Sequence, residues 1–179
     1  MTWTTRGTRT TYENRWIRVR EDEITGPGGD GIYGVVEMRH PAVFIVAVDE
    51  DERVCLVEVD RYTTGRSIEV PAGGSDGEDL LEAARRELRE ETGLFAGSWE
   101  PIGTMNALNG IAVAPEHVFL ARDLSPAGDA AESQLEEGIE RVVWMPFGEA
   151  LGLVASGAIS DGETVAALAY AGIRLGRFA

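Results

Sequence analysis

The sequence lacks any apolar run of about 18 residues, the length that a membrane-spanning helix requires, so we expect no membrane span. The first 16 residues also lack an apolar stretch, so we expect no signal peptide there. Cysteine occurs once, at Cys55, which excludes an internal disulfide and suits a reducing, cytoplasmic location. Cys55 lies in the apolar segment 53–59, RVCLVEV, which predicts a buried and inert thiol.

Lysine is absent as well, and all 16 basic residues are arginine. The net charge is −15 and it is unevenly distributed. Residues 1–40 hold six Arg and six acidic residues, whereas residues 41–179 hold ten Arg and 25 acidic residues. Such a body repels nucleic-acid phosphates, so we expect no nucleic-acid partner. It can still bind an anionic ligand if metal cations neutralise the contact.

The order of apolar patterns and turn signals predicts an α/β protein. Partial alternation over 11–23 and 32–39, around the glycine-rich turn 25–31, predicts an N-terminal β-hairpin. Two apolar strands follow within 42–62, and helical periodicity appears at 78–92. Further strands are expected at 67–74, 99–108, 116–124 and 139–146, a polar loop at 125–138, and helices at 147–157 and 161–175, the last with Asp161 as its N-cap.

Three glutamates crowd one side of the helix predicted over 78–92. Glu87, Glu90 and Glu91 are three or four residues apart and therefore share a face. Like charges at this spacing destabilise an isolated helix by about 0.2–0.5 kcal/mol per pair, which Arg86 offsets in part. A hard dication would turn the repulsion into binding, because Mg²⁺ prefers carboxylate oxygens and water. The alternative interpretation is a solvated, charged helix face.

The ends of this helix carry their own signals. Gly93 follows it as a residue able to take positive φ and terminate it. At the start, Ser75 or Asp76 can cap the helix, with Glu78 in reach of the cap.

The segment GGSDGEDLLEAARRELREETGL, residues 73–94, resembles the Nudix box. That motif reads Gly, five residues, Glu, seven residues, Arg-Glu, an aliphatic residue, any residue, Glu-Glu, any residue, Gly and an aliphatic residue. The residues in register are Glu78, Arg86, Glu87, Leu88, Glu90, Glu91, Gly93 and Leu94. Gly73 precedes Glu78 by five positions rather than six, so the loop before the helix is one residue short.

Other segments resemble the ADP-ribose pyrophosphatase branch of the Nudix family, and together they cover most of the chain. They are YENRWIRVREDE at 12–23, DRYTTGRSIEVPAGG at 60–74 and IERVVWMPFGEAL at 139–151. The resemblance implies a Nudix α/β/α sandwich with a mixed sheet over 41–179. It also implies that the N-terminal β-element, residues 1–40, is exchanged between the subunits of a homodimer.

The resemblance further implies a site for Mg²⁺, or Mn²⁺, with two or more ions. The implied metal ligands are the backbone carbonyl of Ala72 and the side chains of Glu87, Glu90 and Glu91. Arg86 would orient these glutamates, and Glu78 would cap or steer the start of the helix. Glu116, in a loop after the box, is the candidate catalytic base, with Glu90 as its rival. The alternative for Glu116 is an exposed residue at a strand start.

The implied substrate is a nucleoside diphosphate sugar, foremost ADP-ribose, which would yield AMP and ribose 5-phosphate. The branch often has Ser-Pro-Gly where this chain has Leu108-Asn109-Gly110, and that proline is associated with ADP-ribose preference. Two alternatives stay open. One is hydrolysis of another sugar nucleotide such as GDP-mannose, and the other is a non-catalytic Nudix domain that senses a ligand.

Four residues are candidates for substrate binding. Arg61 and Arg66 precede the box, and a guanidinium suits a phosphate, although surface ion pairs are an equal alternative. Glu69 can accept a hydrogen bond from a ribose or a base, or it can be an edge-strand carboxylate. Trp16, like Tyr12 in the same element, can stack on a base or be a structural aromatic.

Overall fold

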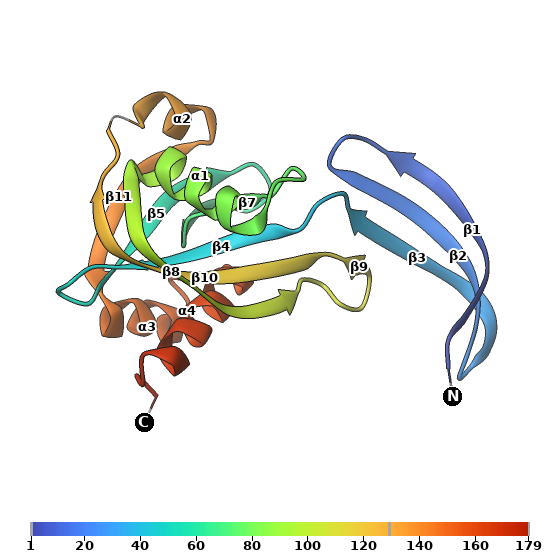
Figure 1. Cartoon of the computed structure of the whole chain (residues 1–179). Coiled ribbons are helices and arrows are strands. Elements are labelled where there is room, and N and C mark those ends of the chain that lie inside the picture. The colour runs from blue at the N-terminus through green and yellow to red at the C-terminus, as the bar shows by residue number, and fades with distance from the viewer. Residues whose placement is uncertain (1, 129, 179) are drawn as a thin grey trace.

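The computed structural model describes residues 2–128 and 130–178, which fold into two β-sheets of unequal size (Figure 1). The smaller sheet is N-terminal. Its strands are β1 (Thr4–Glu13), β2 (Ile17–Gly26) and β3 (Gly29–Met38), with the short β9 (Ala112–Val113) added in parallel beside β3. The N-terminal element is therefore a three-stranded meander, one strand larger than the predicted hairpin.

The extra strand, β1, carries no apolar alternation that could predict it. None of its residues is buried, so its sequence is free of the pattern that marks a half-buried strand. Its turn into β2 is made by Asn14, whose side-chain oxygen accepts from the backbone N–H groups of Trp16 and Ile17 at 2.8 and 2.9 Å. The predicted strand over 11–23 therefore spans this turn.

The larger sheet is mixed, with strand order β11-β5-β4-β10-β8. Its strands are β4 (Ala42–Val48), β5 (Arg53–Arg61), β8 (Leu94–Asn106), β10 (Pro115–Pro126) and β11 (Ile139–Pro146). Strands β4 and β10 run parallel, and the other neighbours are antiparallel. Two short strands extend it: β6 (Gly65–Glu69) pairs with β5, and β7 (Ala72–Gly74) pairs with β4.

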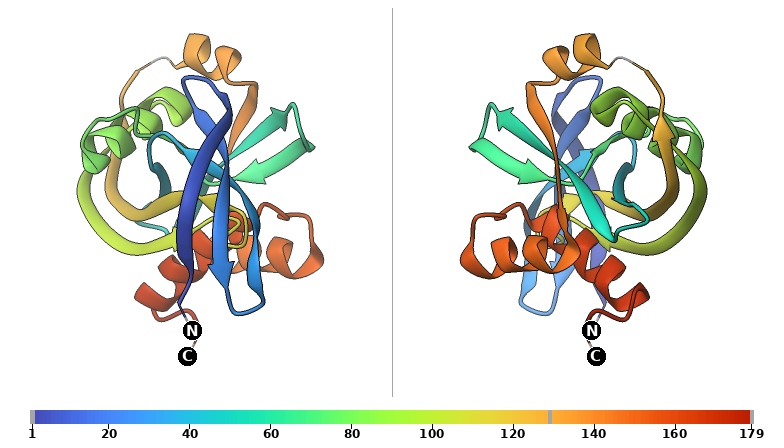
Figure 2. Two further views of the ribbon diagram at one scale, coloured as in Figure 1. Left: turned by 90° about the vertical axis from the view of Figure 1, so that its right-hand side faces the viewer. Right: turned by 90° about the vertical axis from the view of Figure 1, so that its left-hand side faces the viewer.

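Helices cover both faces of the larger sheet (Figures 1 and 2). Helix α1 (Leu80–Thr92) lies on one face, and α3 (Phe147–Ser156) and α4 (Gly162–Arg174) lie on the other. Alternation along β4 explains the two cores: Val43 and Ile45 pack with α1, whereas Val46 packs with α3 and α4. The predicted α/β/α sandwich with a mixed sheet and an N-terminal β-element is confirmed.

Several local predictions can be compared with the structure. Helix α2 (Ala131–Glu136) forms where a polar loop was expected. Helix α1 is capped by Asp79, which accepts from the N–H groups of Leu81 and Glu82, and not by Ser75 or Asp76. Asp76 and Gly77 instead both have positive φ, 49° and 87°, and so form the tight turn of the short loop. Gly93 at φ 70° and the Asp161 cap of α4 are confirmed.

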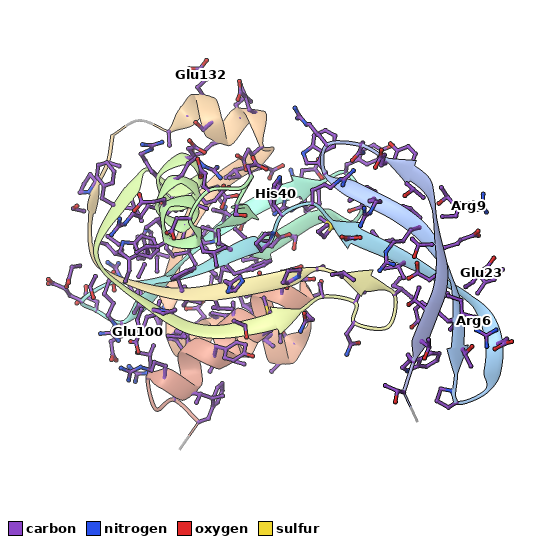
Figure 3. The ribbon with its side chains drawn as sticks, turned by 45° about the vertical axis from the view of Figure 1, so that its right-hand side comes forward. Arg6, Arg9, Glu23, His40, Glu100 and Glu132 are labelled. Atoms are coloured by element: carbon purple, nitrogen blue, oxygen red, sulfur yellow. The ribbon has the colours of Figure 1, made fainter. Side chains whose placement is uncertain are left out.

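Cys55 is fully buried in β5, and burial raises the pKa of its thiol to about 12, as expected for an inert cysteine. Within residues 2–128 and 130–178, no helix combines the length and the apolar character needed to cross a membrane. The chain passes from the N-terminal sheet to the larger sheet at His40 (Figure 3). A Cβ placed on Gly77 would lie 3.5 Å from the ring of His40.

Candidate active site

Helix α1 turns two of its glutamates toward the interior. Its buried residues are Ala83, Ala84, Glu87, Leu88 and Glu91, so the two carboxylates share the face that packs on the sheet. Glu87 is 4% exposed and Glu91 is 2% exposed, whereas Glu90 is half-buried. Glutamates are almost never this buried without a compensating partner. The solvated-face interpretation is therefore wrong for Glu87 and Glu91.

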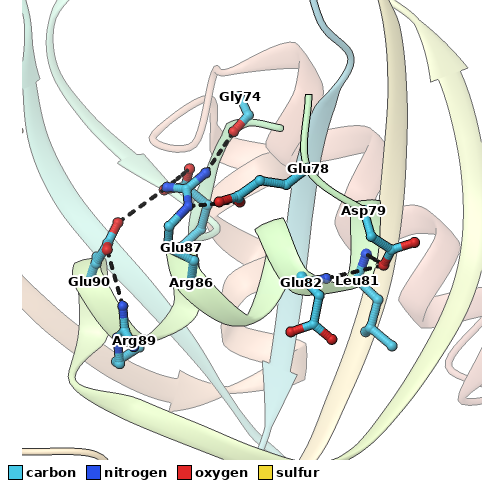
Figure 4. A network of polar contacts seen from close by, with 9 residues as sticks. All are labelled: Gly74, Glu78, Asp79, Leu81, Glu82, Arg86, Glu87, Arg89 and Glu90. Carbon is cyan, nitrogen blue, oxygen red and sulfur yellow. Dashed lines mark hydrogen bonds and ion pairs between the residues drawn. The ribbon is translucent and has the colours of Figure 1, made fainter. Parts of the chain in front are cut away.

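Arg86 is the hub of the polar network on this helix (Figure 4). Its Nη1 donates to Glu87 Oε1 at 2.8 Å and to Glu90 Oε2 at 3.2 Å. Its Nε donates to Glu78 Oε2 at 3.1 Å, and its Nη2 donates to the carbonyl oxygen of Gly74 at 2.9 Å. Arg86 thus holds two box glutamates in place and ties the helix to β7. Glu78 pairs with Arg86, and the cap of the helix is Asp79.

Strand β7 is built directly against the two buried glutamates. The backbone N–H of Ala72 donates to Glu91 Oε2 at 2.9 Å. The α-carbon of Gly73 faces the Glu87 carboxylate, because a Cβ there would lie 2.2 Å from Glu87 Oε1. The structure therefore brings the backbone of Ala72 next to Glu91 through its N–H group, and it requires glycine at position 73.

Replacing Gly73 by alanine is expected to displace the Glu87 carboxylate and to lower kcat by about 10²-fold, because a shift of about 1 Å in a catalytic group has this effect. Gly74→Ala is the matched control, since the nearest atom to its Cβ would be Asp76 Oδ1 at 3.5 Å. Steady-state kinetics of both variants checks the prediction. Equal activity of the two would show that the position of Glu87 is unimportant for turnover.

A carboxylate from outside helix α1, that of Glu137, lies close to Glu87 and Glu90. Glu87, Glu90 and Glu137 each offer an oxygen atom, and these atoms lie within 4.8 Å of one another. Glu137 follows the last residue of α2, and Gln134 of this helix donates to the main-chain oxygen of Glu91 at 2.9 Å. Glu137 lies within the segment 125–138, which was expected to be a polar loop. Its only sequence signal is the acidic pair Glu136-Glu137 before β11, which does not indicate contact with α1.

The cluster holds negative charge that the protein does not fully compensate. Burial raises the pKa of Glu87 to about 7; Arg86 lowers it and Glu137 raises it further. Burial raises the pKa of Glu91 to about 9, against the lowering effect of the Ala72 N–H, and Glu137 and Glu87 add to the rise. Three convergent carboxylate oxygens with excess negative charge match the ligands that a hard divalent cation takes.

A cavity of about 370 Å³ lies beside β7, and Ala72 and Gly73 form part of its wall. The other polar residues that line it are Arg61, Thr63, Thr64, Glu69, Glu116, Asp161 and Glu163. Phe44 is its one aromatic lining residue among those that the structure describes. The cavity therefore extends from the backbone of Ala72 and Gly73, beside the box glutamates, to a second acidic pair at the start of α4, Asp161 and Glu163.

Three of the predicted substrate or catalytic residues line this cavity. Arg61 donates to Glu69 through a contact of 2.6 Å between Nη2 and Oε2, so each neutralises the other. Glu116 is 7% exposed. Burial raises the pKa of Glu116 to about 7, and the charges of Glu163 and Asp161 add to the rise. Glu116 therefore lies with the acidic residues of α4 and is not an exposed residue at a strand start.

Two other predicted substrate residues lie outside the cavity. Arg66 is three residues from Glu69 and so lies on the opposite face of β6, where it pairs with Glu140 at 2.9 Å. Trp16 lies in the turn between β1 and β2, is 55% exposed, and carries the Arg15 guanidinium 4.0 Å above its ring. Neither residue reaches the site within one chain.

Comparisons with known proteins agree with this architecture. Residues 38–168 match the family described as NUDIX domain, and residues 3–36 match the Nucleoside diphosphate sugar hydrolase N-terminal domain. The chain is 34% identical over 158 residues to the ADP-ribose pyrophosphatase of Mycobacterium tuberculosis, covering 87% of this chain and 73% of that protein.

Two further proteins widen the comparison. The GDP-mannose pyrophosphatase of Yersinia enterocolitica is 32% identical over 109 residues, covering 61% of this chain and 57% of that protein. The crystal structure of an ADP compounds hydrolase superposes with a TM-score of 0.82 at 22% identity, over 98% of this chain and 95% of that one. At that identity the superposition shows the shared fold.

Proposed function

The chain belongs to the Nudix family and is a hydrolase of nucleoside diphosphate sugars, and we propose that its substrate is ADP-ribose, cleaved with water to AMP and ribose 5-phosphate. The observation that carries the proposal is the cluster of Glu87, Glu90 and Glu137 beside the cavity. The 34% identity to an ADP-ribose pyrophosphatase supports this choice of sugar nucleotide. GDP-mannose is the second candidate, supported by the 32% identical GDP-mannose pyrophosphatase.

We propose that a divalent cation, Mg²⁺ or Mn²⁺, is held by Glu87, Glu90 and Glu137, with Glu91 and the Ala72 carbonyl beside it. When bound, such an ion neutralises diphosphate oxygens and lowers the barrier to attack by water at phosphorus. The fit rests on the convergence of the three carboxylates within 4.8 Å. An excess of negative charge would otherwise repel the substrate's diphosphate.

The residues of this chain divide the remaining work. Arg86 holds Glu87 and Glu90 in fixed positions through its two contacts. We propose that Glu137 takes the proton of the attacking water, because it is exposed to the solvent side of the cluster and its carboxylate is part of it. Glu116 is the catalytic base that the sequence suggested, and Glu90 is the other candidate for this role. Arg61 lines the cavity and can turn from Glu69 toward a phosphate.

We propose that residues 1–40 form a dimerisation element attached to the catalytic domain, residues 41–179. Several large apolar side chains of the N-terminal sheet are exposed, among them Trp3, Tyr12, Trp16 and Ile32. Large apolar side chains exposed on one element suit association with a second copy. In such a dimer, Trp16 could stack on the base in the partner's site. Sedimentation equilibrium tests the dimer, and a monomer at micromolar concentration would contradict it.

A panel of possible substrates tests the proposed function. We expect fast cleavage of ADP-ribose in the presence of Mg²⁺ or Mn²⁺ and none after a chelator is added. The panel also contains GDP-mannose, ADP-glucose, UDP-glucose, NADH and a nucleoside triphosphate. If another sugar nucleotide is cleaved faster, the proposed reaction stands and the proposed substrate is wrong. A failure to cleave any of them, despite metal, would contradict the proposal and favour a ligand sensor.

A further inference from the structure

A second cavity lies between helix α1 and strand β8. Its volume is about 590 Å³, and among the described residues it has no lining residue in common with the cavity beside β7. Its walls combine charged and aromatic side chains with one alanine: Glu78, Glu82, Arg85, Arg86, Arg89, Phe95, Ala96 and Trp99. Sites for small molecules typically have volumes of about 300–1,000 Å³, so this cavity is large enough for one.

The lining of this cavity differs in charge from that of the cavity beside β7. Its described lining includes three arginines and two glutamates, whereas the cavity beside β7 has one arginine and four acidic residues. The chain as a whole carries a net charge of −15. A local excess of positive charge on such a protein favours an anionic ligand at this place.

Arg85 and Arg89 are the arginines that can turn toward such a ligand. Arg86 is committed, because each of its guanidinium nitrogens already donates within the network of the candidate active site. Arg85 pairs with Glu82 at 2.5 Å, and Arg89 pairs with Glu90 at 3.2 Å (Figure 4). The two arginine side chains are 49% and 51% exposed. Exposed pairs of this kind contribute little to stability, so a phosphate can replace the glutamates.

The aromatic part of the wall is held in place without a ligand. The indole N–H of Trp99 donates to the main-chain oxygen of Ala96 at 3.0 Å. The ring of Trp99 also packs edge-on against the buried Phe119, with 6.4 Å between the ring centroids. Phe95, on the same strand, is 50% exposed. Aromatic rings stack on nucleobases, and rings fixed in advance lose little conformational freedom when they do so.

We infer that this cavity binds a nucleoside monophosphate, with its phosphate at Arg85 and Arg89 and its base against Phe95 and Trp99. Guanidinium groups suit the phosphate, and the aromatic pair suits the base. A single nucleotide is favoured over a nucleic-acid strand, because the net charge of −15 repels a chain of phosphates. The inference goes beyond the proposed function, since this site needs neither a metal nor hydrolysis.

Calorimetry of the full chain with AMP and a chelator tests the inference. Without metal, the acidic cavity beside β7 repels the phosphate. We expect Arg85→Gln and Phe95→Ala each to weaken AMP binding by about 10-fold, since one loses a charged hydrogen bond and the other a stacking contact. Glu82→Gln should tighten AMP binding by about twofold, because the competing partner of Arg85 is removed. Ribose 5-phosphate, which lacks the base, should bind the wild type about 10-fold more weakly than AMP.

A control in the other cavity locates the bound nucleotide. Arg61→Gln removes the arginine of the cavity beside β7 and should leave the Kd for AMP within about twofold of the wild type, as expected for a distant site. Weaker binding by Arg61→Gln, with unchanged binding by Arg85→Gln and Phe95→Ala, would place AMP beside β7 and overturn the inference. A wild type that binds no AMP at millimolar concentration would also overturn it, as would tighter binding of a short single-stranded DNA than of AMP.

Discussion

Glu137→Gln is expected to lower kcat for the best sugar-nucleotide substrate by about 10²–10⁴-fold, the usual contribution of a general base. The carboxylate of Glu137 lies in the cluster with Glu87 and Glu90, and it is the exposed member of the three. Glutamine has nearly the same shape but cannot take a proton from water. Since the side chain is exposed at the end of α2, the variant should fold normally. Steady-state kinetics at saturating Mg²⁺ measures the effect.

The neighbouring residue gives a matched control for this variant. Glu136 is the last residue of α2 and is also exposed, but it does not belong to the carboxylate cluster. Glu136→Gln removes the same charge one residue away and should keep kcat within about twofold, as surface substitutions usually do. A Glu137→Gln enzyme with near wild-type kcat would remove Glu137 from the chemistry. If Glu116→Gln then lost kcat on every substrate, Glu116 would be the base.

Glu91→Gln is expected to abolish most turnover, by about 10²-fold or more, while leaving the fold intact. Glu91 is 2% exposed and accepts from the Ala72 N–H at 2.9 Å, a bond that the glutamine oxygen can retain. What the variant loses is a carboxylate that a bound cation would hold ionised beside Glu87 and Glu137.

The same variant should be more heat-stable than the wild type when no metal is bound. Burial raises the pKa of Glu91 to about 9, so at neutral pH the metal-free fold keeps this carboxyl protonated whereas the unfolded chain ionises it, and this difference lowers the free energy of unfolding. Glutamine removes this penalty, and we expect a midpoint higher by about 2–4 °C, the shift for about 1 kcal/mol at this chain length. Added Mg²⁺ should raise the midpoint of the wild type more than that of the variant.

Glu82→Gln serves as the control on the same helix. Glu82 lies in the exposed first turn of α1, where it pairs with Arg85 at 2.5 Å. Exposed helix pairs contribute only about 0.3–0.5 kcal/mol, so neither the melting midpoint nor turnover should change much. Wild-type turnover in Glu91→Gln would contradict the assignment of Glu91 to the metal site. A lower melting midpoint of Glu91→Gln would show that the carboxyl group of Glu91 stabilises the metal-free fold.

Helix α1 is the part of the candidate site that could be predicted from the sequence. Glu87, Glu90 and Glu91 are fixed on one helical face by their spacing, and Arg86 precedes them at a spacing that permits the observed contacts. The unbroken apolar run of β4, AVFIVAV, is likewise typical of a strand that is covered on both faces. These are local relations between residues a few positions apart, which the periodicity of helices and strands determines.

For the candidate substrate residues, strand alternation predicts which side chains share a face of the sheet but not which face borders the cavity. Glu69 and Arg66 are three positions apart on β6, so period-two alternation alone places them on opposite faces. The sequence does not say which face borders the cavity, because that depends on where β5, β7 and α4 pack. The same holds for β1, whose pairing with β2 is stabilised by backbone hydrogen bonds and leaves no apolar pattern in its residues.

The sequence by itself therefore determined the family, the helix with its three glutamates, the two-faced sheet and the reactions that such a site can support. Only the tertiary structure decided that Glu137 of the predicted loop completes the cluster, that Gly73 must be glycine, and that Glu116 lies with the acidic end of α4. The physical reason is distance along the chain. Periodicity constrains neighbours within one element, whereas contacts between separate elements depend on how their apolar faces pack together.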